Sequence, residues 1–549
     1  MSAKRGSDCF NKNSRLTKRP ELNSSNDSSL TPLASEDIKT KLAKLLKIQN
    51  DFFPCFDWTF PPPLLSKQQP AYSSKELFSN PSVVPGRYSI YLHSPFCKSL
   101  CSFCYYAIIP GKGIDLAEKY TDYLVKEMSL YAEHFKGQIC ESIYFGGGTP
   151  TFLDDHLLEK IFTGLNENFN ICDDAEITVE AAPGTLPREK CILLKSLGVN
   201  RLSYGVQTLD EELLSNMNRE YSVTQAVQEL KDAIDVIGNV NVDTMYGFDG
   251  ESENTLIETL EKFHQLGVPS LSIYALDKQR SEKMVLFEPP RDDAYQYKIK
   301  QFARAEKYLM ALDYKPVLQN IFINPDRSSY RHQLRRWDNL PLVALGLNSQ
   351  GYAPQKAYNN TASLKSYYQL IDEGKLPVAT MDELNAELEL CRELTSKLRF
   401  TYVSLGEFKY KYNVDIAEVF KDLISALVDM EYLECHGDIL RMTDKASYYN
   451  NIIPMLFAPD RFKQELLGLP EEYLETFPVP HIMTQLGQAQ SKPFGLSESR
   501  HIVNTDRRTQ SNRRKRNDLT DVTDQRLSFG PGRRNSDGVW SWSSINSFS

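Results

Sequence analysis

Short apolar runs alternate with longer amphipathic runs from residue 87 onward, and this alternation constrains the fold more than any other feature. Six of the short runs have the length and composition of β-strands. They lie at residues 88–93, 141–146, 176–181, 201–206, 240–245 and 270–276. Runs with helical periodicity lie between them, near 115–136, 154–169, 187–197, 222–237 and 252–266. Strands separated by helices indicate βα units and therefore a parallel sheet.

Right-handed crossovers would curl such a sheet into a whole or partial barrel. Periodicity alone does not separate a six-stranded open barrel from a doubly wound sheet. In either arrangement, the carboxyl ends of parallel strands meet at one edge, where chemistry is usually found.

Residues that carry chemistry follow the predicted strands at these ends. They are a cysteine loop after the first strand, Gly146–Thr149 after the second, Glu180, Gln207, Asp243 and Ala275. A polar residue at one strand end is often incidental, because loops begin there. Six in succession predict one functional rim.

Three cysteines, Cys97, Cys101 and Cys104, stand at positions i, i+4 and i+7 of the first loop. Thiolates select iron–sulfur clusters or zinc, and a closed site of either kind uses four protein ligands. Here the local count stops at three, since Tyr105 and Tyr106 follow. A cubane held by three thiolates keeps one iron open, as a catalytic metal requires. The alternatives are a zinc knuckle or three unrelated buried cysteines.

The rest of the composition sets broad limits. The chain has 549 residues, a formal charge of −9 and ten cysteines. The other seven are scattered, which favours a reducing, cytoplasmic setting: Cys9, Cys55, Cys140, Cys172, Cys191, Cys391 and Cys435. The first residues lack the apolar run of a signal peptide, and no run of 18 apolar residues predicts a transmembrane helix. The acidic balance argues against nucleic acid as the main partner.

The C-x3-C-x2-C spacing resembles the radical S-adenosylmethionine (SAM) superfamily. The resemblance implies a [4Fe-4S] cluster on the three cysteines, with SAM chelated by the open iron. It also implies a one-electron donor protein, whose electron splits SAM to methionine and a 5′-deoxyadenosyl radical. This radical takes a hydrogen atom from a small-molecule substrate.

Five further segments narrow the resemblance. They are Tyr91-Leu-His-Ser-Pro-Phe-Cys, Phe145-Gly-Gly-Gly-Thr-Pro-Thr, Val179-Glu-Ala-Ala-Pro-Gly-Thr, Arg201-Leu-Ser-Tyr-Gly-Val-Gln and Val242-Asp-Thr-Met-Tyr-Gly. Together they look like the oxygen-independent coproporphyrinogen III oxidase family, over about residues 85–455. This family includes a haem chaperone and methyl-transferring relatives. The resemblance implies an α/β fold, a partial (β/α)6 barrel with a small helical, winged-helix-like C-terminal domain, and a tetrapyrrole-type substrate.

The true oxidase of this family binds two SAM molecules, and the resemblance carries their contacts onto this chain. Tyr91, Gly147 and Glu180 would contact the SAM on the cluster. Phe103, Gly148, Thr149, Gln207, Arg219, Asp243 and Ala275 would line the second SAM site. Arg219 is suited to pair with a SAM carboxylate, although a solvated charge at the start of a helix is an equal alternative.

Three departures from the family pattern bear on the reaction. Tyr106 stands where the oxidase has a further cysteine, Ser94 replaces an isoleucine before Pro95, and Tyr246-Gly-Phe-Asp249 replaces Tyr-Gly-Leu-Pro. The expected activity is that of a radical SAM oxidoreductase, in which propionate decarboxylation is the parent reaction. Radical methyl or methylene transfer and haem delivery by a chaperone with little turnover stay open as alternatives.

A basic segment, Tyr330-Arg-His-Gln-Leu-Arg-Arg-Trp337, follows a helix expected at 291–312. A histidine-containing segment lies at a similar place in the haem chaperones, so His332 is a candidate haem ligand. Its arginines are candidates for substrate carboxylates. A basic surface loop is the favoured interpretation.

The sequence divides into five parts. A disordered segment is expected at 1–35, an N-terminal helix with an extended approach at 36–86 and the barrel domain at 87–380. A C-terminal helical domain is expected at 381–458, with a hairpin around His436-Gly-Asp. The basic tail at 480–549 is expected to be disordered, with a weak anionic partner such as nucleic acid or a membrane surface.

Overall fold

The computed structural model describes residues 86–458, except 105, 112, 249–250, 277–293, 319, 401 and 450–452, together with 39–40, 42–43, 67–68 and 73–80. The predictions for 1–35 and for the basic tail lie outside the described residues. Residues 39–40 and 42–43, within the predicted N-terminal helix, are helical. None of the described helices is long and apolar enough to cross a membrane.

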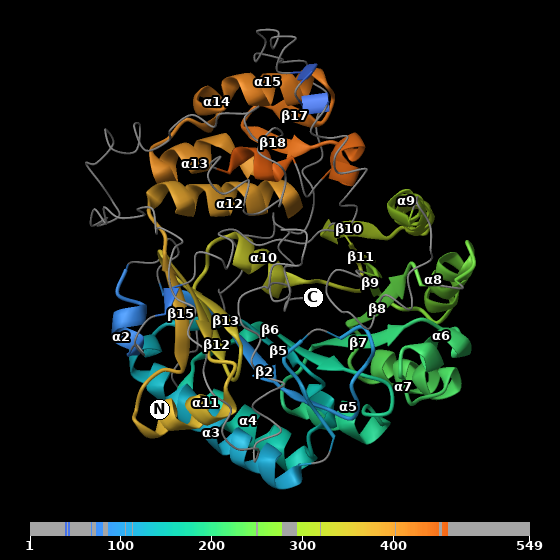
Figure 1. The fold of residues 1–549 in the computed structure, drawn as a ribbon, viewed down its shortest axis with the longest axis vertical. Coiled ribbons are helices and arrows are strands. Elements are labelled where there is room, and N and C mark those ends of the chain that lie inside the picture. The colour runs from blue at the N-terminus through green and yellow to red at the C-terminus, as the bar shows by residue number, and fades with distance from the viewer. Residues whose placement is uncertain are drawn as a thin grey trace, which may run out of the picture.

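Six parallel strands form the centre of the fold, as predicted. They are β2 (Arg87–Ser94), β5 (Ile139–Gly147), β6 (Ile171–Ala181), β7 (Arg201–Gln207), β8 (Val240–Tyr246) and β9 (Ser270–Ala275), and they pair in this order. Figure 1 shows them as a strongly twisted sheet. The α/β fold with a mostly parallel sheet is therefore confirmed.

The sheet extends beyond the six predicted strands on both sides. β12 (Leu342–Leu345) adds a further parallel strand beside β2, and β13 (Gln350–Ala353), β14 (Lys356–Asn360), β15 (Val378–Glu383) and β1 (Lys67–Gln68) continue it antiparallel. β11 (Ile321–Ile323) and β10 (Lys315–Leu318) continue it beyond β9. The described chain thus has an open sheet whose outer strands are short, and short strands give a weak sequence signal.

The predicted helices between the strands are present. They are α3 (Ile114–Phe135), α4 (Asp155–Asn168), α5 (Arg188–Ser196), α7 (Val223–Val236), α8 (Thr255–Gln265) and α9 (Ala294–Ala311). A short helix that was not predicted, α6 (Glu211–Asn216), begins at Asp210, whose side chain accepts two backbone N–H groups. The remaining helices of this part are α2 (Ser74–Leu77) and α11 (Leu364–Asp372). Their apolar faces pack on the sheet in one large core.

The concave face of the sheet carries many polar side chains. Ser89 and Ser142 share a hydrogen bond of 2.8 Å between their hydroxyls. The Asn241 amide bonds the hydroxyls of Ser203, Ser270 and Ser272. Buried polar groups are costly unless each has a hydrogen-bond partner. This face is therefore suited to contact a polar ligand or a polar segment of the chain.

The C-terminal domain follows the sheet and is drawn in orange in Figure 1. It consists of α12 (Ala386–Phe400), β16 (Val403–Ser404), α13 (Leu405–Tyr412), α14 (Ile416–Val419), α15 (Lys421–Asp429), β17 (Leu433–His436), β18 (Ile439–Met442) and two short 3-10 turns at Asp444–Tyr449 and Pro454–Phe457. β17 and β18 form the predicted hairpin, and Gly437 takes φ +57° in its turn. A second apolar core fills this domain and continues onto side chains of the sheet, such as Tyr91 and Tyr144.

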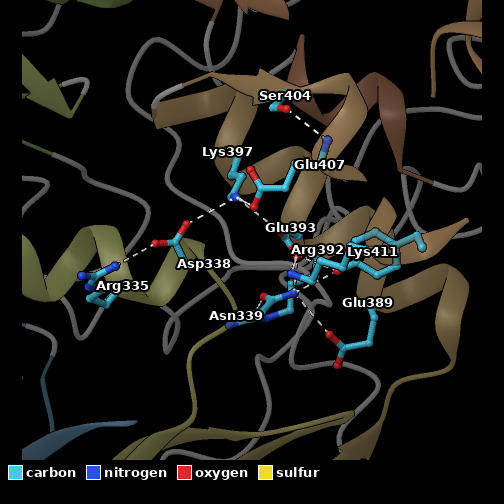
Figure 2. A network of polar contacts seen from close by, with 11 residues as sticks. Arg335, Asp338, Asn339, Glu389, Arg392, Glu393, Lys397, Ser404, Glu407 and Lys411 are labelled. Carbon is cyan, nitrogen blue, oxygen red and sulfur yellow. Dashed lines mark hydrogen bonds and ion pairs between the residues drawn. The ribbon is translucent and has the colours of Figure 1, made fainter. Parts of the chain in front are cut away.

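The helix α10 (Arg331–Trp337) lies between the barrel and the C-terminal domain and contacts both. Figure 2 shows the polar network that joins them. The Lys397 ammonium lies 3.3 Å from an Asp338 carboxylate oxygen and 3.1 Å from a Glu393 carboxylate oxygen. Arg335 pairs with Asp338 at 3.5 Å and with Glu141 of β5 at 3.0 Å. Charges of both signs therefore link the two parts of the chain.

Glu393 is the central acid of this network. Its carboxylate is fully buried and accepts hydrogen bonds from the Lys411 ammonium, from the Tyr412 hydroxyl at 2.6 Å and from the Asn339 amide at 3.2 Å. Burial opposes ionisation, but Lys411 and Lys397 outweigh it and lower the pKa of Glu393 to about 2. Glu393 is therefore ionised at neutral pH.

We predict that Glu393→Gln lowers the free energy of unfolding by about 3–5 kcal/mol at neutral pH, because it leaves buried cations without their carboxylate. The carboxylate has a lower pKa when folded, so its contribution exists above the unfolded pKa and fades as pH falls toward 2. Urea unfolding at several pH values measures both effects. Glu407→Gln is the matched control, because Glu407 also pairs with Lys397, at 3.3 Å, but is 55% exposed. Equal losses for the two variants would contradict the prediction.

Candidate functional site

The cysteine loop is fixed to the carboxyl ends of β2 and β5. It leaves β2 through β3 (Phe96–Cys97) and returns through β4 (Ile109–Pro110), which pairs with β3. The Gly148 N–H donates to the Ser94 carbonyl at 2.6 Å, and the Thr149 N–H donates to the Phe96 carbonyl at 2.8 Å. The loop is thus held by the backbone of the glycine run.

Glycine is required where the two segments meet. A Cβ on Gly147, whose φ is +108°, would lie 2.4 Å from the His93 ring. A Cβ on Gly148 would lie 2.6 Å from the Phe96 carbonyl oxygen and 3.0 Å from the Cys97 Sγ. Only a backbone without side chains approaches the thiol this closely.

The three thiols lie near one another and are each partly exposed. The Cys97 Sγ is 3.5 Å from the Thr149 hydroxyl. Burial raises the pKa of Cys97 to about 11 and that of Cys104 to about 12, and neighbouring thiols add to both shifts. Among the described residues, no three His, Cys, Asp or Glu side chains are arranged to hold a single metal ion. The thiols therefore offer three soft ligands without a preformed single-ion site.

The residues predicted for the first SAM gather beside this loop. Glu180 accepts the Gly147 N–H at 2.9 Å and the Tyr144 hydroxyl at 2.8 Å. Burial raises the pKa of Glu180 to about 8. Tyr91 stacks on Tyr144 with 6.1 Å between ring centroids, and its hydroxyl bonds the His93 Nδ1 at 3.2 Å. The structure thus brings Tyr91, Gly147 and Glu180 to one rim.

Arg219 reaches the cysteine loop because its own loop docks there. The Asn218 amide donates to the Leu100 carbonyl at 2.7 Å. The guanidinium carbon lies 5.4 Å from the Phe103 ring, and Nε is buried without a hydrogen-bond partner. Burial disfavours the charge, but the three cysteines and Tyr221 together outweigh it and raise the pKa of Arg219. A half-buried cation whose Nε–H is buried and unpartnered beside three thiols is suited to an anionic ligand.

The other residues predicted for a second SAM site, Gln207, Asp243 and Ala275, each have different neighbours. Gln207 has φ +73° and approaches Arg219, since a Cβ on Gly205 would lie 3.0 Å from Gln207 Nε2 and 3.9 Å from an Arg219 nitrogen. Asp243 bonds the Ser203 hydroxyl at 3.0 Å and the Asn241 amide at 2.8 Å. Burial raises the pKa of Asp243. Ala275 ends β9.

The segment around His332 differs from the favoured prediction of a basic surface loop, which is wrong. It forms the buried helix α10, because both oxygens of Glu176 accept the N–H groups of Arg331 (2.7 Å) and His332 (2.9 Å) at its first turn. His332 is 0% exposed, its Nδ1 lies 2.9 Å from the Ser142 hydroxyl, and its Nε2 has no partner. Burial lowers the pKa of His332 to about 3.

Sequence reasoning missed three residues of the rim and interior. Tyr144 lies opposite Tyr91 in the β2–β5 register, and His93 is two residues beyond Tyr91 on the same face. His93 lies within the first of the five family segments and Tyr144 within the predicted strand 141–146, and period-2 alternation would have placed both inside. Arg201 opens a quoted motif as well, yet nothing in the sequence marks it as buried.

Comparison with known proteins gives the chain a family context. The radical SAM superfamily model matches residues 91–263. The haem chaperone HemW of Lactococcus lactis is 27% identical over 68% of this chain and 97% of its own length. The oxygen-independent coproporphyrinogen III oxidase of Helicobacter pylori is 26% identical over 62% of this chain and 79% of its own length.

One solved structure shares most of the fold. The coproporphyrinogen III oxidase HemN from Escherichia coli, a radical SAM enzyme, aligns with a TM-score of 0.64 and 21% identity. The alignment covers 73% of this chain and 96% of that protein. The likeness supports the fold assignment.

We predict that Gly148→Ala displaces the cysteine loop, because the added Cβ would meet a backbone oxygen at 2.6 Å. The three thiols should then react faster with a thiol reagent in the metal-free protein, and stability should fall by about 1–3 kcal/mol. Gly238→Ala is the control for backbone strain without a clash: its φ is +87° but a Cβ there meets nothing within 4 Å, so stability should fall while thiol labelling stays unchanged. Unchanged thiol labelling in the Gly148 variant would contradict the prediction.

Proposed function

Because this chain belongs to the radical SAM superfamily, in the family of the oxygen-independent coproporphyrinogen III oxidases and their relatives, we propose that it cleaves SAM reductively on a [4Fe-4S] cluster held by Cys97, Cys101 and Cys104. The superfamily uses this cluster and SAM as its cofactors. When bound, they supply a 5′-deoxyadenosyl radical, which abstracts hydrogen from a substrate. The observation that carries the proposal is the joint placement of three thiols, a glycine backbone and the half-buried Arg219 at one rim.

The residues present fit these cofactors. Three thiolates are the ligand set of a cluster with one open iron. Gly147 and Gly148 leave backbone exposed beside the Cys97 thiol, where a small ligand needs close approach. Arg219 offers an unsatisfied N–H to a carboxylate, and Glu180 is the acid nearest the glycine run, suited to an amino or hydroxyl group.

The substrate proposed is a tetrapyrrole or a related molecule, since the named relatives act on coproporphyrinogen or carry haem. Tyr106 replaces the further cysteine of the oxidase, which argues against simple propionate decarboxylation. Radical methyl or methylene transfer with a second SAM is the nearest alternative, supported by Gln207, Arg219 and Phe103 around one site.

The test is an anaerobic assay of the reconstituted chain with reductant and SAM, with and without coproporphyrinogen III. We predict 5′-deoxyadenosine by mass spectrometry, and its loss in Cys101→Ser, which removes a cluster ligand. Cys435→Ser is the control, because this partly exposed cysteine lies in the C-terminal domain. Decarboxylated porphyrin would identify the oxidase reaction, and S-adenosylhomocysteine would identify methyl transfer. A wild-type chain that holds its cluster but forms no deoxyadenosine would contradict SAM cleavage.

A second candidate is a haem chaperone, favoured by the HemW relatives and by His332. The buried imidazole is neutral at physiological pH, and its free Nε2 is a competent iron ligand. Haem would reach it only after α10 moves away from the barrel, because His332 is fully buried.

For this candidate we predict that full-length protein binds haem and that His332→Ala weakens binding at least about tenfold, as expected for a lost axial ligand. Visible absorption during haem titration measures the affinity and the ligand change. His156→Ala is the control, because this histidine is exposed on α4. Equal haem binding by both variants would show that His332 is not a haem ligand. The haem chaperone hypothesis would then have no support from the structure.

A further inference from the structure

Arg201 is a buried arginine that makes no direct ion pair, although Glu180 and Asp243 lie near enough for its charge to lower their pKa. It begins β7 and is 1% exposed. Its Nε and Nη1 have no hydrogen-bond partner, and within the described part of the chain it forms no salt bridge. Its guanidinium carbon lies 3.9 Å from the centre of the Tyr330 ring. The ring covers one face of the guanidinium and leaves its N–H edge for another group.

Two further unsatisfied polar groups lie on the same inner surface. Thr178 is the register partner of Arg201 on β6, and its hydroxyl is buried without a partner. The buried, unpartnered Nε2 of His332 approaches from α10, near enough that Arg201 lowers the pKa of this imidazole. Three elements therefore direct donors or acceptors without partners into one region.

The acidic residues around Arg201 are engaged elsewhere. Both oxygens of Glu176 accept backbone N–H groups of α10. Glu180 is held by Tyr144 and Gly147, and Asp243 by Ser203 and Asn241. None of the three lies within ion-pairing distance of the guanidinium in the described structure.

A buried charge without a direct ion pair is costly, and an unsatisfied buried polar group in a native protein calls for a ligand, a water or a functional role. The best match for a guanidinium edge is a carboxylate, which accepts two parallel N–H groups. The Thr178 hydroxyl is able to donate to the same anion.

We infer that Arg201 and Thr178 bind a ligand carboxylate inside the barrel. This site lies two residues before Glu180 and Ser203 on their strands, about 7 Å deeper than the rim. The inference rests on the proposed function, because the expected ligand is an acidic side chain of the substrate that enters below the SAM site. A SAM carboxylate and a free small acid are the other sources of the same chemistry.

The test is equilibrium binding to the full chain with its cluster reconstituted anaerobically. The probes are coproporphyrin III, its tetramethyl ester, SAM and propionate. We expect Arg201→Gln to weaken coproporphyrin III at least tenfold and to leave the ester unchanged. Arg201→Lys should bind with intermediate affinity, since it keeps the charge but loses the bidentate contact. Arg188→Gln, on the exposed face of α5, is the matched control and should bind like the unmodified chain.

The remaining arms separate the sources and the rival explanation. A tenfold loss for SAM or for propionate, with coproporphyrin III unaffected, would support a carboxylate site and assign it to that molecule. Thermal unfolding of the ligand-free variants is the structural readout: the midpoint for Arg201→Gln should change little, because the guanidinium makes no direct ion pair and its Nε and Nη1 have no hydrogen-bond partner. A lower midpoint with all four affinities unchanged would overturn the inference and make Arg201 a packing residue.

The inference and the proposed function fail in different ways. If the unmodified chain makes no deoxyadenosine but still discriminates the acid from its ester through Arg201, the inference stands and the radical reaction fails. If deoxyadenosine forms and Arg201→Gln binds every probe normally, the proposed function stands and the inference fails.

Discussion

The close contact between the glycine run after β5 and the cysteine loop after β2 is the constraint on which the site depends. Two backbone hydrogen bonds join the segments, from Gly148 to Ser94 and from Thr149 to Phe96. They are available because β2 and β5 are parallel neighbours whose carboxyl ends lie side by side. Of the three cysteines only Cys97 belongs to a strand, and the part of the loop beyond it is held by Asn218, whose amide donates to the Leu100 carbonyl. The sheet thus converts a flexible ligand set into a positioned one.

The polar interior of the barrel has a second consequence. The inner face of the sheet is lined by serines, Asn241 and acidic side chains, which need polar partners. The helix α10 supplies such partners. Glu176 binds the first turn of this helix, and Ser142 binds the His332 imidazole. At its other end, Asp338 and Asn339 enter the buried ionic network of the C-terminal domain. One short helix is therefore held by both parts of the chain.

Much of the fold was predictable because its signals are local. The six central strands and most helices between them follow from alternation and periodicity, and the cysteine motif and glycine run identify the rim. The burial of α10 was not predictable, because it depends on Glu176, which lies 156 residues from His332 in sequence. An arginine-rich segment is predicted to be exposed to solvent unless its carboxylate partners are known. Glu141 is such a partner for Arg335. β12 was not predictable for a similar reason: its four residues form a strand through pairing with β2, which is distant in sequence.

The two candidate functions place opposite demands on this architecture. Cleavage of SAM requires a rim that stays rigid and a substrate that enters from the carboxyl ends of the strands, so a firmly seated α10 is compatible with it. Haem ligation by His332 requires α10 to move away from the sheet. This movement would break the hydrogen bonds of α10 with Glu176 and with the Ser142 hydroxyl. It would also disturb the ion pair between Asp338 and Lys397. Removing a partner from a buried ion pair is expensive, on the order of 3–5 kcal/mol, so the seated helix is the resting state of the chain. The contacts of a ligand that binds His332 must offset this free energy. The affinity for haem therefore depends on how strongly the C-terminal domain binds α10.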